Sequence, residues 1–291
     1  MFSRKERYHM AIRFIVDSAS DLLPEECREL GILHIPMPVT FGGTCYADAV
    51  DLTHREFYEK LIECTELPTS SQASPVAFEE AFRQVTEAGD TAICIVVSGG
   101  LSGTYQSAMI AAEPFGDSVI VIDSESVCVG QRILTLRGLE LAAQGLDAAA
   151  IAAALNEEKK KIRVLALLDT LEYLKKGGRI SAATAFAGSL LSIKPVIAIE
   201  NGAVTMAGKA RGSKQGNNLL RELVAKCGGI NFEKPFAVAY SGLSDTMLRK
   251  YVEDSGDMLG SHAAELKLTT VGCAIGVHAG PGAVAVAFFE H

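Results

Sequence analysis

The chain has 291 residues, of which 48% are hydrophobic, enough apolar material for a sizeable core and for two domains. Its 27 basic and 35 acidic side chains give a formal charge of −8, and the sequence has no Trp. This balance argues against nucleic-acid binding, which depends on Lys and Arg that neutralise phosphates and on aromatic side chains that stack on bases.

Cysteine usage and hydropathy suggest a reducing, aqueous location. The seven cysteines are odd in number and none form a C-x-x-C pair, so we expect neither disulfides nor a metal site. The N-terminal stretch MFSRKERYHM lacks the apolar core of a signal peptide, and Met10 is a second candidate start. Residues 271–289 are nearly all apolar, but HAGPG at 278–282 interrupts them. We expect two buried strands joined by a loop there, no stable membrane insertion and a cytoplasmic protein.

Five short apolar runs each end in a small polar residue. The residues that follow the runs are Asp17, Ser98, Asp123, Asp169 and Ser241. Continuous Val, Ile and Leu are typical of strands buried on both faces, as in parallel sheets. Helical patterns between several of these runs predict helices over 54–64, 75–88, 103–113 and 147–160. This alternation indicates an α/β fold, in which ligands bind at the carboxyl ends of the strands.

Local signals mark several helix ends and a change in the character of the strands. Ser74 precedes Pro75 as an N-cap before a first-turn proline, and Asp169 and Glu172 have capping-box spacing before a helix that Gly177 would end. After about residue 160 the strands become more amphipathic, and a hairpin is predicted to turn at 201–202. We therefore expect an N-terminal α/β domain with a parallel sheet over 11–160. A C-terminal mixed-sheet α+β domain would cover 161–291.

The segment SGGLSGTYQSA at 98–108 has the density of hydroxyls and glycines expected of a site. Its spacing does not match a P-loop or a dinucleotide-binding motif. The glycines around Ser102 are also misplaced for a G-x-S-x-G nucleophile elbow, although a serine hydrolase acting through Ser98 or Ser102 remains an alternative. A serine-rich turn that leads into a helix N-terminus suits an anion. The purely structural interpretation, with Ser98 ending a strand and Ser102 capping a helix, stays open.

Two further segments support an anion site. LPTSSQASP at 67–75 places Thr69, Ser70 and Ser71 before another helix start, and two such loops would suit a ligand with an anionic end and an apolar body. YLKKGGRIS at 173–181 adds a basic stretch that includes Arg179. Taken alone, the first segment is equally a capped loop and the second an ordinary basic helix terminus.

Together these segments resemble the DegV family of bacterial lipid-binding proteins. The matching stretches, in chain order, are IVDSASDLLPE (15–25), TSSQASP (69–75), SGGLSGTYQSA (98–108), VIDSESVCVGQ (121–131), LDTLEYLKKGGRIS (168–181), IKPVIAIENGAV (193–204), KARGSKQG (209–216) and HAGPGAVAV (278–286). The resemblance implies one long-chain fatty acid held between the two domains. It also implies a carrier without catalytic residues or cofactor, which presents the fatty acid to a separate ATP-dependent fatty acid kinase for acyl phosphate formation and phospholipid synthesis. A lipid sensor or transport module without a kinase is the other alternative.

The resemblance also suggests site residues. Ser70 and Ser98 are expected to contact the carboxylate, with Ser71, Ser102 and Thr69 as further candidates. Arg179 is expected near the pocket mouth, and His278 near the head group or holding its own loop. Ser70 stands where the family usually has Thr, which keeps the hydroxyl, whereas Ala73 replaces a proline. The Ala- and Gly-rich stretch at 184–193 is a candidate lining of the acyl tunnel or plain helix packing.

Overall fold

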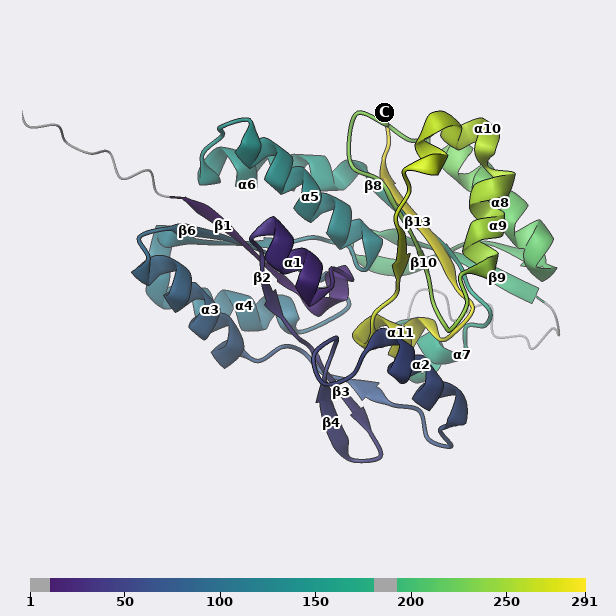
Figure 1. Cartoon of the computed structure of the whole chain (residues 1–291), viewed down its shortest axis with the longest axis horizontal. Helices are drawn as coiled ribbons and strands as arrows, with labels where there is room; N and C mark the ends of the chain where they lie inside the picture. Colours follow the sequence, from purple (N-terminus) through teal and green to yellow (C-terminus); the bar gives the residue numbers. More distant parts are fainter. Residues whose placement is uncertain (1–10, 181–192) are drawn as a thin grey trace, which may run out of the picture.

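A computed structural model describes residues 11–180 and 193–291, and it contains two main sheets that lie side by side (Figure 1). The first sheet has the strand order β2-β1-β6-β7, and all its strands are parallel. Their bounds are β1 Ile12–Asp17, β2 Leu33–Ile35, β6 Thr91–Val96 and β7 Val119–Asp123. Every residue of β6 is buried, as the continuous apolar run predicted.

Helices cover both faces of the first sheet. Figure 1 shows α3 and α4 on one face and α5 and α6 on the other, the latter pair leading toward the second sheet. The helices of this half are α1 Pro24–Leu30, α2 His54–Glu63, α3 Pro75–Glu87, α4 Thr104–Ala112, α5 Val129–Ala143 and α6 Ala148–Glu158. The four predicted helices are confirmed within two residues. Ser74 caps α3 through a hydrogen bond from the Ala77 N–H (3.2 Å), with Pro75 as the first helical residue.

The second sheet is mixed and has the strand order β10-β9-β8-β13-β11-β12. Its strands are β8 Ile162–Leu167, β9 Ile193–Glu200, β10 Ala203–Arg211, β11 Ala237–Tyr240, β12 Leu268–Thr270 and β13 Val284–Phe289. The pair β11 and β12 is parallel and the other pairs are antiparallel. The predicted hairpin is present: Asn201 (φ 50°) and Gly202 (φ 74°) form the turn between β9 and β10.

Helices and a small third sheet complete the chain. The remaining helices are α7 Glu172–Lys176, α8 Gly212–Lys226, α9 Thr246–Asp254, α10 Gly256–Leu259 and α11 Cys273–Ala279. The small antiparallel sheet has the order β4-β3-β5, formed by β3 Pro38–Phe41, β4 Thr44–Ala47 and β5 Thr69–Ser70. None of the helices within 11–180 and 193–291 has both the length and the apolar character to cross a bilayer.

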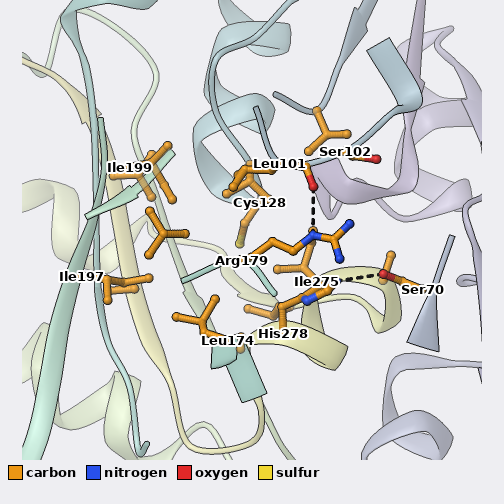
Figure 2. A pocket seen from close by; sticks show the side chains of 18 of the residues that line it. Ser70, Leu101, Ser102, Cys128, Leu174, Arg179, Ile197, Ile199, Ile275 and His278 are labelled. Atoms are coloured by element: carbon orange, nitrogen blue, oxygen red, sulfur yellow. Dashed lines mark hydrogen bonds between the residues drawn. The ribbon is translucent and has the colours of Figure 1, made fainter. Parts of the chain in front are cut away.

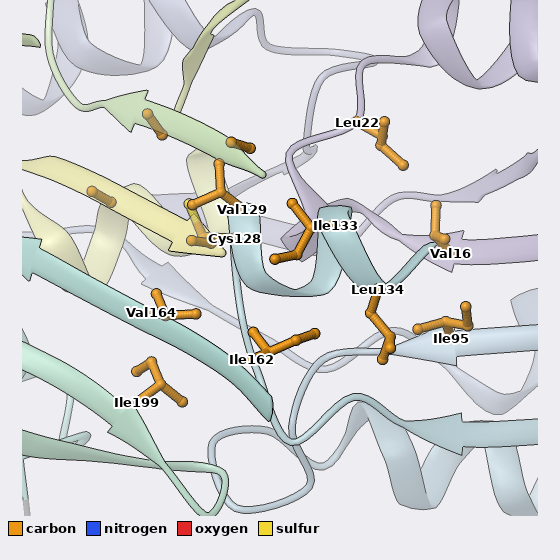
Figure 3. Close-up of a cluster of buried hydrophobic side chains, with 14 of the residues drawn as sticks. Val16, Leu22, Ile95, Cys128, Val129, Ile133, Leu134, Ile162, Val164 and Ile199 are labelled. Atoms are coloured by element: carbon orange, nitrogen blue, oxygen red, sulfur yellow. The ribbon is translucent and has the colours of Figure 1, made fainter. Parts of the chain in front are cut away.

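The core is continuous between the two main sheets because α5 packs against both of them. Ile133 and Leu134 of α5 belong to one buried cluster with Ile95 of the first sheet and with Val164 and Ile199 of the second (Figure 3). Glycine makes the approach to the first sheet possible: a β-carbon at Gly138 would lie 2.7 Å from the Phe14 ring. The α5 helix therefore holds the two sheets at a fixed separation.

The prediction for 271–289 is wrong in its first half. Residues 273–279 form the helix α11, and only 284–289 form a strand, β13. The reason is tertiary, because the Asp48 carboxylate accepts hydrogen bonds from the Cys273 and Ala274 N–H groups (both 3.0 Å) and caps the new helix. A short apolar run does not reveal such a distant cap, so its periodicity fits a strand equally well.

One other local prediction is also corrected. Asp169 does not cap α7; its carboxylate pairs with Lys194, and Thr170 Oγ1 accepts from the Glu172 N–H (3.1 Å) instead. The buried runs before Asp169 and Ser241 form β8 and β11 of the mixed sheet, in which β8 is antiparallel to both neighbours. This pairing confirms the mixed sheet expected after residue 160, since burial on both faces does not by itself determine strand direction.

Candidate functional site

A cavity of about 160 Å³ lies between the first-sheet half of the chain and the second sheet. Strands of the second sheet form one wall with aliphatic side chains, including Val164, Ala166, Ile197, Ile199, Val204 and Ala285. The opposite wall comes from loops after first-sheet strands and from α11. Most of the lining is therefore apolar, as expected of a pocket that buries a hydrophobic ligand.

Polar side chains gather at one end of this cavity. They are Ser70, Ser71, Gln72, Ser102, Arg179 and His278. Figure 2 shows Ser70, Ser102 and the Arg179 guanidinium on one side of the cavity, with Ile197 and Ile199 on the other. No Asp or Glu is among the described residues that line it. This end offers hydroxyls and one permanent cation, which suits a bound anion.

Ser70 and His278 meet at the polar end although they are 208 residues apart, with Ser70 Oγ 2.9 Å from His278 Nε2. The other ring nitrogen, Nδ1, is buried and has no hydrogen-bond partner among the described residues. Burial, helped by the positive charge of Arg179, lowers the pKa of His278 to about 4. The imidazole is therefore neutral at pH 7 and adds no charge to the polar end of the cavity.

Arg179 is held by backbone carbonyls from both halves of the chain. Its Nε donates to the Leu101 carbonyl (3.1 Å), and its Nη1 donates to the Gly177 carbonyl (2.7 Å). Leu101 belongs to the loop after β6, whereas Gly177 ends α7. These two bonds fix the guanidinium at the cavity while leaving further N–H groups for a ligand.

The two serine-rich loops are joined to each other. Ser102 Oγ lies 2.9 Å from Thr104 Oγ1, which in turn accepts from the Ala73 N–H (3.3 Å). Gln72 Nε2 donates to Ser107 Oγ (2.9 Å). A β-carbon at Gly103 would lie only 1.9 Å from Gln72 Oε1, so a larger residue there would displace the end of the Gln72 side chain. The contacts position Ser70, Ser71 and Ser102 as one polar surface.

Of the seven predicted ligand residues, the cavity gathers five: Ser70, Ser71, Ser102, Arg179 and His278. Thr69 and Ser98 are not among the lining residues. Thr69 is exposed on β5, where it pairs with Thr40, and Ser98 is 1% exposed with its hydroxyl bonded to the Gly202 carbonyl. A direct role in ligand contact stays a prediction for all seven.

The apolar wall was largely missed from the sequence. Ile197, Ile199 and Val204 were recognised only as parts of a hairpin, and Cys128 was not singled out, although its side chain also faces the cavity (Figure 2). The β9–β10 hairpin has an inward-facing apolar row, but nothing local shows whether that row meets a core or a cavity. The proposed tunnel lining at 184–193 falls outside the described residues up to 192.

A second group of side chains has the composition of a metal site. Ligand atoms of Asp48, His54 and Cys273 lie within 4.8 Å of one another. Both Asp48 oxygens already accept backbone N–H groups at the start of α11, and one also accepts the Ser18 hydroxyl (2.9 Å). These bonds account for the buried carboxylate as the cap of α11.

Comparison with known proteins places this architecture in a family. A family model described as "Uncharacterised protein, DegV family" matches residues 11–291. A DegV domain-containing protein of Deinococcus radiodurans is 34% identical over 290 residues, covering 96% of this chain and 98% of the relative.

Solved structures agree with this relationship. A fatty-acid-binding DegV family protein from Thermus thermophilus is 31% identical, with a TM-score of 0.87 over 97% of this chain and all of that one (100%). A stearic acid-binding protein from Eubacterium ventriosum is 26% identical, with a TM-score of 0.84 over 95% of this chain and 97% of that one. With its two sheets, its interposed cavity and these relatives, the chain belongs to the DegV family.

Proposed function

We propose that this protein binds one long-chain fatty acid in the cavity between the sheets. The carboxylate would lie at the Ser70, Ser102 and Arg179 end, and the acyl chain would run toward Ile197 and Ile199. The observation that carries this proposal is the segregation of the lining: polar groups, including one cation, lie at one end of an otherwise apolar cavity. Two solved relatives are described as fatty-acid-binding and stearic acid-binding proteins.

The energetics favour such a ligand. Burial of an acyl chain gains about 0.8 kcal/mol per methylene, so a long chain outweighs the desolvation of one carboxylate that has well-placed donors. Hydroxyls from Ser70 and Ser102, the imidazole of His278 and the Arg179 guanidinium supply those donors. The neutral state of His278 at pH 7 leaves Arg179 as the cation that faces the head group.

Binding is tested first by native mass spectrometry of the purified protein. We expect a co-purified mass that matches a fatty acid, or uptake of added myristic acid at one molecule per chain. A protein that stays ligand-free with excess fatty acid would exclude the proposal.

The polar end is tested by removing two hydroxyls. Ser70→Ala/Ser102→Ala should weaken myristic acid binding by about tenfold or more, because two donors worth about 1 kcal/mol each are lost. Binding of myristyl alcohol should change less, since the alcohol has no carboxylate to stabilise. The matched control is Ser244→Ala/Thr246→Ala, which removes two hydroxyls that bond each other (2.8 Å) on the exposed surface. Equal losses for acid and alcohol would show that the serines support the fold and not the carboxylate.

We further propose that the bound fatty acid is presented to a separate ATP-dependent kinase in the cytoplasm, which phosphorylates its carboxylate for phospholipid synthesis. The proposal is supported by the motif-level resemblance and by Arg179, which lines the polar end of the cavity and follows the basic residues Lys175 and Lys176 in the chain. The test is ATP-dependent acyl phosphate formation, trapped by hydroxylamine, with the host's candidate kinase and the loaded protein. Absence of acyl phosphate with an active kinase would favour a lipid transport or sensing module.

One observation favours a second candidate, an acyl ester hydrolase. Ser70 Oγ and His278 Nε2 are within hydrogen-bond distance, the geometry of a nucleophile and its base. The low pKa of His278 makes it a weak base, and its Nδ1 has no orienting partner within the described residues. Turnover of a p-nitrophenyl ester that disappears in Ser70→Ala would support the hydrolase, and no turnover would exclude it.

A further inference from the structure

Ser98 makes a hydrogen bond that joins the two halves of the protein. Its hydroxyl, at the end of β6, donates to the carbonyl of Gly202 (2.7 Å), which lies in the turn of the β9–β10 hairpin of the second sheet. The same oxygen accepts the Gly100 N–H (3.1 Å). Ser98 is 1% exposed, so water does not compete for this bond.

The backbone around this bond is built for close approach. A β-carbon at Gly202 would lie 2.5 Å from Ser98 Oγ, and one at Gly100 would lie 2.8 Å from the Gly202 carbonyl oxygen. Gly202 also has a φ of +74°, which favours glycine. Both glycines are therefore required for the hairpin turn to reach the loop that carries Ser98.

A further contact holds the loop after β7 in place beside this junction. Lys159, whose side chain is 9% exposed, pairs with Glu125 (2.9 Å) and donates to the Asp123 carbonyl (2.8 Å). The Glu125 backbone is packed against the turn, with its Cα 3.6 Å from the position of a β-carbon at Gly202. The hairpin turn thus fits into a fixed socket formed by the loops after β6 and β7.

This junction connects opposite walls of the cavity. The loop after β6 contributes Leu101 and Ser102 to the lining, and the hairpin contributes Ile199 and Val204. Separation of these walls would widen the path for a ligand that lies between them. The bond from Ser98 to Gly202 therefore stabilises the closed arrangement of the cavity.

We propose that Ser98 is an interdomain latch, a positioning residue that sets the rate of ligand exchange without touching the carboxylate. The proposal rests on the proposed function, because the exchanged ligand is the fatty acid. Loss of the latch favours opening of both the empty and the loaded protein. Association and dissociation should therefore accelerate together while Kd changes little. Loss of a carboxylate contact would instead raise the dissociation rate alone, and only for the acid.

Stopped-flow kinetics of Ser98→Ala with myristic acid and with myristyl alcohol test this inference. We expect the association and dissociation rates to rise by up to about tenfold, because the loss of one buried hydrogen bond changes an equilibrium by about that factor. The rise should be equal for the two ligands. Ser98→Thr, which keeps the hydroxyl, should restore slow exchange. The matched control is Thr135→Val, which also loses a buried hydroxyl, but one that donates within α5 to the Gln131 carbonyl (3.0 Å).

The outcomes separate the possibilities. Unchanged rates in Ser98→Ala would overturn the latch, and so would a faster dissociation confined to the acid, which would place Ser98 on the carboxylate. Gly202→Ala should accelerate exchange as Ser98→Ala does. Gly228→Ala should not, because Gly228 has a similar φ (+87°) but no atom within 4 Å of its β-carbon position.

Hydrogen exchange of the ligand-free protein distinguishes failure of the latch from failure of the proposed function. In Ser98→Ala we expect faster amide exchange over 201–204 and 99–102 than in the wild type, with Thr135→Val unchanged there. This result would support the latch even if the wild type bound no fatty acid. Unchanged exchange in both segments would overturn it whatever the protein binds.

Discussion

Two buried carboxyl groups lie at and just after the end of β1. Asp17 accepts the Val97 N–H (2.7 Å) and the Ala19 N–H (2.9 Å), so its charge is partly compensated. Asp21 accepts the Gly272 N–H (2.9 Å) through one oxygen, while the other oxygen is buried without a partner among the described residues. Burial raises the pKa of Asp17 to about 6 and that of Asp21 to about 7.

Asp21 should make the protein less stable as the pH rises. Its pKa of about 7 in the folded protein lies above the ordinary value of 3.8, so the stability that the protonated carboxyl contributes is fully present below pH 3.8 and is lost as pH rises through 7. Asp21→Asn keeps an acceptor for the Gly272 N–H and removes the ionisation. The free energy of unfolding of this variant, relative to wild type, should increase by on the order of 2–3 kcal/mol between pH 5 and pH 8.

Urea unfolding at the two pH values measures this difference. Asp117→Asn, the same change at an exposed carboxyl group, is the control for the substitution itself. A constant difference for Asp21→Asn would mean that Asp21 ionises normally in the folded protein.

At the scale of elements, α5 occupies the central position between the sheets. Its Gly138 faces the Phe14 ring of β1, and Leu155 of α6 lies on the same side. Glycine is a poor helix former, so its presence in the middle of a long helix reflects the packing distance. The helix lies close enough to β1 to leave no room for a methyl group.

Gly138→Ala should therefore destabilise the protein by about 1–3 kcal/mol, because overpacking against Phe14 outweighs the gain in helix propensity. Gly256→Ala in α10 is the matched control: no atom lies within 4 Å of its β-carbon position. We expect the control to be neutral or slightly stabilising. Thermal or urea unfolding distinguishes the two, and a stabilised Gly138→Ala would contradict the close packing of α5.

At the scale of the whole molecule, the two sheets share their hydrophobic core. One buried cluster includes Val16 and Ile95 from the first sheet and Val164, Ile199 and Phe289 from the second (Figure 3). A second cluster joins Phe57 and Phe78 to Cys273 and Val277 of α11. A division of the chain near residue 160 would expose apolar surface on both sides.

We therefore expect the intact protein to unfold in one cooperative transition. Far-UV circular dichroism and tyrosine fluorescence should give the same urea midpoint, and calorimetric and van't Hoff enthalpies should agree. Two separate transitions, or a stable fragment 11–160 with native hydrogen-exchange protection, would show that the predicted domains fold independently.

The sequence alone predicted the elements whose signals are local. The buried run in β6, the Ser74–Pro75 start of α3 and the Asn201–Gly202 turn each follow from neighbouring residues. The family resemblance then predicts from the sequence that Ser70, Ser102, Arg179 and His278 belong to one site. These residues carry their chemistry in short motifs, and the cavity does gather them.

Only the tertiary structure decided the features that depend on distant partners. Residues 273–279 are helical because Asp48, more than 200 positions earlier, caps them. Ser98 and Ser102 look alike in the sequence, yet Ser102 lines the cavity while Ser98 donates to Gly202 across the two halves. Whether Ile199 faces a core or a cavity is likewise decided by how the two sheets pack on either side of α5. Burial and pairing arise from the packing of separate segments, and a local pattern does not contain that information.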